Sequence, residues 1–97
     1  MLTDKAKIDF EKWLQEQEVA PYKSMFWDIP IIVQNAYLIE WLDSVGITIE
    51  VSKYNEIRFQ SGIFESDELY DHVFSTRQES IQSAIQKANE LYNTTHP

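Results

Sequence analysis

The chain has 97 residues, of which 43% are apolar and 13% are aromatic. This length fits one domain, and the composition is typical of a folded protein rather than a disordered one. Sixteen acidic residues oppose eight basic ones, so the formal net charge is −8. That charge disfavours direct binding to nucleic acid or to an anionic membrane, because both depend on Lys and Arg.

The residue types in the chain also indicate its cellular compartment. There is no cysteine, which excludes disulfides, zinc ribbons and thiol nucleophiles. Asp4 and Asp9 fall where a signal peptide would keep an apolar run. The apolar runs, such as residues 31–33, are far shorter than the roughly 20 residues of a membrane span. We expect a cytoplasmic protein.

The first predicted element is a helix over residues 2–18. Thr3 is expected to be its N-cap and to offer its hydroxyl to a free backbone N–H of the first turn. One stripe of the helix is apolar at helical spacing and comprises Leu2, Ala6, Phe10, Trp13 and Leu14.

Residues 19–27 are expected to connect two helices, yet they carry four large apolar side chains: Tyr22, Met25, Phe26 and Trp27. Connections are usually polar, so these side chains must be covered. They either fold back onto the core or extend a surface that binds another molecule.

A second helix is predicted over residues 29–45, with Pro30 in its first turn and Gly46 just beyond its end. It is apolar around most of its circumference. Such a helix is either central and buried, or it packs inside on one flank and against a second molecule on another. The second possibility predicts self-association, as a homodimer, or a partner protein.

From Gly46 the apolar period changes to two, which predicts strands within residues 47–75. Two strands are expected near 47–51 and 57–63, with a turn at 54–56, and a third at 69–75. The faces of the third strand are ambiguous. In one orientation Tyr70 and Phe74 join Tyr54 and Phe64 on an open, protein-binding face; in the other, these aromatics are core.

The last predicted helix covers residues 76–93. Thr76 and Glu79 have the T-x-x-E spacing of a capping box. The apolar stripe that follows consists of Ile81, Ala84, Ile85, Ala88, Leu91 and Tyr92. The predicted fold is therefore α+β, a single ααβββα domain over residues 1–97, with a three-stranded antiparallel meander packed on one face by helices.

No catalytic or binding motif stands out. The chain contains no phosphate-binding loop, dinucleotide fingerprint, nucleophile elbow or EF-hand. Asp71 and His72 are adjacent on a predicted strand and so point to opposite faces. The ααβββα order includes the topology of a double-stranded-RNA-binding domain, but Arg77 and Glu79 offset each other where that fold needs clustered basic residues. We expect no enzyme activity, no cofactor and no metal.

Three segments, Trp41 to Ile47, Ser75 to Glu79 and Ala84 to Asn93, resemble small uncharacterised proteins of bacterial viruses and prophages. The resemblance implies a bacterial or phage cytoplasm. It implies no activity.

The function predicted from the sequence is that of a non-enzymatic protein-interaction or accessory factor. The alternatives are an acidic mimic of nucleic acid that inhibits a DNA- or RNA-binding protein, and a small enzyme that uses carboxylates. The candidate protein-binding residues are Tyr22, Met25, Phe26, Trp27, Tyr54, Phe64, Tyr70 and Phe74.

Overall fold

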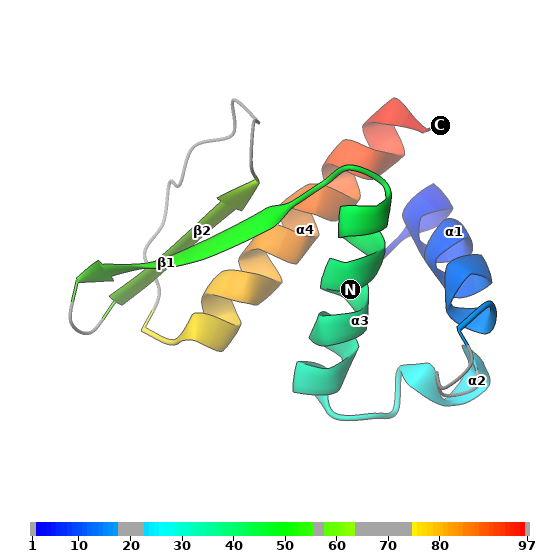
Figure 1. The fold of residues 1–97 in the computed structure, drawn as a ribbon, viewed down its shortest axis with the longest axis horizontal. Helices are drawn as coiled ribbons and strands as arrows, with labels where there is room; N and C mark the ends of the chain where they lie inside the picture. Colours follow the sequence, from blue (N-terminus) through cyan, green and yellow to red (C-terminus); the bar gives the residue numbers. More distant parts are fainter. Residues whose placement is uncertain (1, 18–22, 56–57, 64–74, 97) are drawn as a thin grey trace.

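The computed structural model describes residues 2–17, 23–55, 58–63 and 75–96. Their elements, in chain order, are α1 (Asp4–Gln15), α2 (Lys23–Phe26), α3 (Ile31–Ser44), β1 (Ile49–Asn55), β2 (Arg58–Ile63) and α4 (Arg77–Thr95). Helix α4 lies in the middle: the β1–β2 hairpin packs against one side of it, and α1 and α3 pack against another (Figure 1).

The predicted fold class, an α+β ααβββα arrangement with a three-stranded meander, is wrong. The described residues are mostly helical, in the order αααββα, and their strands form one two-stranded antiparallel ribbon. Among the residues whose burial is described, the buried apolar ones come from the helices, with Leu2 and Ile47 added, so this part of the core is made by helices packed on helices. The predicted third strand, 69–75, lies outside the described residues except for Ser75.

The three long helices fall within two or three residues of the predicted ranges 2–18, 29–45 and 76–93. The short helix α2 was predicted as a connection. It turns the chain so that Phe26 enters the core, where its side chain is only 1% exposed. Burial of this ring explains how a connection can carry such large apolar groups.

Phe10 of α1 is the centre of an aromatic cluster. Its ring centroid lies 5.1 Å from that of Phe26, 5.7 Å from Trp41, and 5.9 Å from both Trp13 and Trp27. The edge-on and tilted angles of these pairs are the favoured geometry for aromatic rings. The cluster therefore joins α1, α2 and α3 at one point of the core.

The beginning of α1 is capped differently from the prediction. Thr3 is the N-cap residue, but its hydroxyl makes no hydrogen bond to the helix. Instead the Ala6 N–H donates to Oδ1 of Asn93 at 2.8 Å, and the Thr3 N–H donates to Oδ1 of Asn89 at 2.8 Å. Two side chains of α4 thus satisfy backbone donors at the start of α1, and the Thr3 hydroxyl accepts hydrogen bonds from both side-chain amides.

The predicted end of the second helix is confirmed. Gly46 has φ +87°, the left-handed conformation that favours glycine, and the Ile47 N–H donates to the carbonyl of Leu42 at 2.8 Å. In the hairpin that follows, Ile49 pairs with Ile63 and the register is irregular between Lys53 and Asn55. The turn predicted at 54–56 is wrong in its first two residues, because β1 continues through Asn55.

Helix α4 begins and packs as predicted. The Glu79 N–H donates to the Thr76 hydroxyl at 3.1 Å, as an N-cap requires. The Glu79 carboxylate accepts from that same hydroxyl at 3.0 Å rather than from the backbone of Thr76, so only half of the capping box forms. The predicted stripe faces the core through its buried residues Ala84, Ile85, Ala88 and Tyr92.

Candidate functional site

Three consecutive apolar side chains are exposed in the first turn of α3. The exposed fractions are 45% for Ile31, 67% for Ile32 and 39% for Val33. We call these three residues the α3 ridge. Scattered exposed apolar residues are common on protein surfaces, whereas three together are the kind of feature that marks a contact surface.

The ridge is exposed because two amide side chains take the inward positions of the same turn. Gln34 is 8% and Asn35 is 4% exposed. The Gln34 Nε2 group donates to the carbonyls of Trp27 at 3.1 Å and Ile29 at 2.8 Å, and so holds the turn that leads into α3. Further along, the inner face of the helix is apolar and comprises Leu38, Trp41 and Leu42.

A cavity of about 250 Å³ lies beside the ridge, between the first half of α3 and the first half of α4. Trp27, Leu38 and Ile85 form apolar parts of its wall, and Ile31 belongs to both the wall and the ridge. The ridge and the cavity are therefore one continuous feature, which we take as the candidate site.

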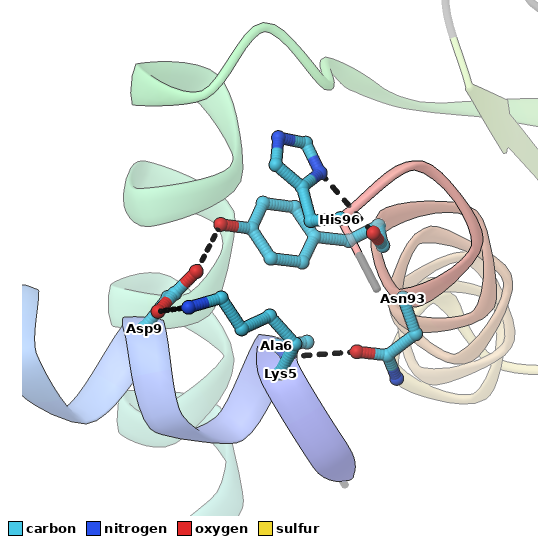
Figure 2. A network of polar contacts seen from close by, with 6 residues as sticks. Lys5, Ala6, Asp9, Asn93 and His96 are labelled. Atoms are coloured by element: carbon cyan, nitrogen blue, oxygen red, sulfur yellow. Dashed lines mark hydrogen bonds and ion pairs between the residues drawn. The ribbon is translucent and has the colours of Figure 1, made fainter.

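A second polar cluster joins α1 to the end of α4 (Figure 2). The Tyr92 hydroxyl donates to Asp9 at 2.6 Å, and the other carboxylate oxygen of Asp9 lies 3.2 Å from the Lys5 ammonium. The His96 ring stacks on the Tyr92 ring with centroids 4.0 Å apart. The cluster brings a tyrosine, a carboxylate and a histidine together. These are side chains that general acid–base catalysis uses.

The electrostatics of this cluster favour a structural role. The hydrogen bond from Tyr92 lowers the pKa of the Asp9 carboxyl below its usual value. Burial, with the Asp9 carboxylate adding to it, raises the pKa of Tyr92 to about 12. At neutral pH the phenol is therefore protonated and the carboxylate ionised, which is the state that holds the hydrogen bond and not the state of a nucleophile or base.

Replacing Tyr92 by Phe is expected to remove a stability contribution that depends on pH. A hydrogen bond to a carboxylate is worth about 1.5–3 kcal/mol, which is the expected cost at pH 7. Because the folded-state pKa of Tyr92 is raised, this contribution is complete from neutral pH up to pH 10 and declines as the pH rises toward 12. Urea unfolding of both proteins at pH 7, 10 and 11.5 measures it. A constant difference at all three values would contradict the role given to Tyr92.

The residues predicted to bind a protein differ in their exposure and in their place in the structure. Met25 is 57% exposed, Phe26 is in the core, and Trp27 is half-buried in the wall of the cavity. Helix α2, which carries Met25, lies at the same end of the molecule as the start of α3 (Figure 1). Tyr54 is in β1, but its side chain is outside the described residues, as are the whole residues Tyr22, Phe64, Tyr70 and Phe74.

Sequence reasoning missed the polar half of the site. Gln34, Asn35, Gln82 and Gln86 line the cavity, and none of them was a candidate. A signal for them was present: residues 29–39 form the longest run without a charged residue, and residues 80–86 form another. In a chain with 25% charged residues, two uncharged runs that face each other across a cavity indicate a neutral site.

Within residues 2–17, 23–55, 58–63 and 75–96, no group of three or more His, Asp or Glu side chains is placed to hold a metal ion. None of the described helices combines the length and the apolar character needed to cross a membrane.

Comparison of the chain with protein-family models, with curated proteins and with solved structures gives no match. The resemblance to phage and prophage proteins therefore stays a prediction.

Proposed function

We propose that this protein is a non-enzymatic interaction factor that binds a basic segment of a partner protein through the α3 ridge and the adjoining cavity. The observation that carries the proposal is the exposure of Ile31, Ile32 and Val33 beside a neutral cavity. Apolar contact would supply the affinity, and charge would select the partner.

Charge around the site supports a basic partner. The charged residues of α3 are Glu40 and Asp43, both acidic, and the exposed Asp28 lies just before the helix. The two basic residues of α4, Arg77 and Lys87, already interact within the chain. Lysine and arginine side chains that flank an apolar segment would therefore meet acidic residues on α3 and just before it.

The same charges oppose a second copy of the chain as the occupant. In a symmetric dimer the same patch meets itself, so Asp28 and Glu40 would face the acidic rim of the other copy. Each copy also carries a net charge of −8, which adds repulsion at a distance. We therefore expect a monomer on its own.

Selection of twelve-residue peptides from a random displayed library against the whole protein tests the proposal. Enriched peptides are expected to combine apolar residues with Lys or Arg. A synthetic copy of the best peptide is expected to lose at least about tenfold in affinity when Ile32 is replaced by Asp, because a charge then replaces apolar contact area. An acidic residue in the first turn of a helix is favourable, so Ile32→Asp should fold.

Ile8 on α1 supplies the matched control, since it is 52% exposed and lies on a different helix. The Ile8→Asp variant is expected to bind the peptide as the parent does. Absence of enriched peptides, or an equal response of the two variants, would overturn the proposal. A dimer in sedimentation at low micromolar concentration that Ile32→Asp dissociates would also overturn it, in favour of self-association.

A further inference from the structure

The cavity beside the ridge has an apolar half and an amide half. Its apolar half is formed by Trp27, Ile31, Leu38 and Ile85, and its amide half by Gln34, Asn35, Gln82 and Gln86. None of the eight residues is charged. A buried charge would need a compensating partner that this lining does not offer, so the cavity suits an uncharged group.

One donor in the cavity wall is unpartnered. Among the residues that the structure describes, none offers a hydrogen-bond acceptor to the Nδ2 group of Asn35, although this residue is only 4% exposed. Its neighbour Gln34 uses its own amide to hold the carbonyls of Trp27 and Ile29. Buried donors almost always have a partner, and an orphaned one carries a cost that a ligand can relieve.

The volume limits the size of the group. An apolar cavity of about 150 Å³ is large enough to admit benzene. This cavity, at about 250 Å³, has room for a six-membered ring with a polar substituent. The half-buried Trp27 offers an aromatic surface against which such a ring can pack.

We propose that the cavity between α3 and α4 binds an uncharged aromatic group that carries an oxygen acceptor, of which a tyrosine side chain in the partner segment is the protein-borne form. The ring contacts Trp27, Leu38 and Ile85, and the oxygen accepts from Nδ2 of Asn35. This inference deepens the proposed function, on which it rests for the source of the aromatic group, by naming the anchor of the partner.

Titration of the isotope-labelled protein with p-cresol, followed by two-dimensional ¹H–¹⁵N NMR, tests the cavity without any partner. Saturable shifts are expected at the Asn35 side-chain amide and at the Trp27 indole N–H. Toluene has the same ring without the oxygen and is expected to bind roughly 2- to 12-fold more weakly, the range for one net hydrogen bond.

The Asn35→Leu variant removes the donor and puts an apolar side chain of similar shape in its place. It is expected to lose the preference for p-cresol and to bind toluene at least as tightly, because the hydroxyl of p-cresol then lacks its donor. No saturable shift with p-cresol, or toluene binding as tightly as p-cresol to the parent protein, would overturn the inference, and this second comparison does not depend on the folding of the variant.

The two proposals fail separately. If p-cresol binds as expected and no peptide is enriched, the cavity is a site for a small aromatic molecule and the proposed function fails. If peptides are enriched but p-cresol leaves the Asn35 and Trp27 signals unchanged, the partner binds through the ridge and the inference about the cavity fails.

Discussion

Replacing Phe10 by Ala is expected to lower the free energy of unfolding by about 3–5 kcal/mol, the usual cost of removing a buried aromatic ring. Phe10 is 0% exposed and its ring contacts four other aromatic rings, from α1, α3 and the segment around α2. Small domains have only about 5–15 kcal/mol in total. The expected loss is therefore a large fraction of the total stability, and the urea midpoint of the variant should fall accordingly.

Urea unfolding followed by far-ultraviolet circular dichroism measures this loss, and Ile8→Ala is the control. Ile8 is on the same helix and 52% exposed, so its truncation should change stability by less than about 1 kcal/mol. If Phe10→Ala unfolds at nearly the same urea concentration as Ile8→Ala, the aromatic cluster does not hold the core together.

Replacing Asn89 by Ala is expected to cost about 2–4 kcal/mol, which is a large effect for a polar residue. Asn89 is 2% exposed, accepts from the Thr3 N–H and donates to the Thr3 hydroxyl. Truncation removes both hydrogen bonds and leaves a space in the wall between α1 and α4. Each lost bond is worth about 1 kcal/mol, and the backbone donor left behind adds a further penalty.

Hydrogen exchange at the start of α1 separates this cause from a general loss of stability. In Asn89→Ala the amide of Thr3 should exchange faster than the global unfolding rate explains, because its acceptor is lost, whereas the amide of Ala6 keeps its acceptor on Asn93. Glu90→Ala is the control, since Glu90 is the exposed neighbour, and it should leave these amides unchanged. Equal exchange of the Thr3 amide in the two variants would mean that Asn89 does not protect the start of α1.

The hydrogen bonds between α4 and the segment 3–9 join the two ends of the chain. Thr3 and Asn89 are 86 positions apart, and Asp9 and Tyr92 are 83 apart. Closing so long a loop costs conformational entropy, so these bonds can form only when the core between α1 and α4 has brought the helices together. The polar contacts at this end of the molecule therefore depend on the apolar ones, and the two variants above test them separately.

Local signals in the sequence were sufficient to locate the three long helices. Thr76 as an N-cap, Gly46 as a C-terminal stop and the stripe that contains Ile85 each act within about one turn of helix, and the structure confirms all three. The same kind of reasoning found the alternating pattern that becomes the hairpin. It also detected that residues 29–45 carry more apolar surface than one helix can bury in a core of this size.

The tertiary structure alone decided which surface is buried and which remains outside. The amide side chains of Gln34 and Asn35 turn inward and the ridge turns outward, although apolar periodicity would assign them the reverse. The aromatic connection contains helix α2, whose Phe26 packs against Phe10. Helix α1 is capped by Asn93, which lies near the other end of the chain. Each outcome depends on contacts between residues that are distant in the sequence. Apolar periodicity and helix caps involve only residues a few positions apart, so they do not encode these contacts.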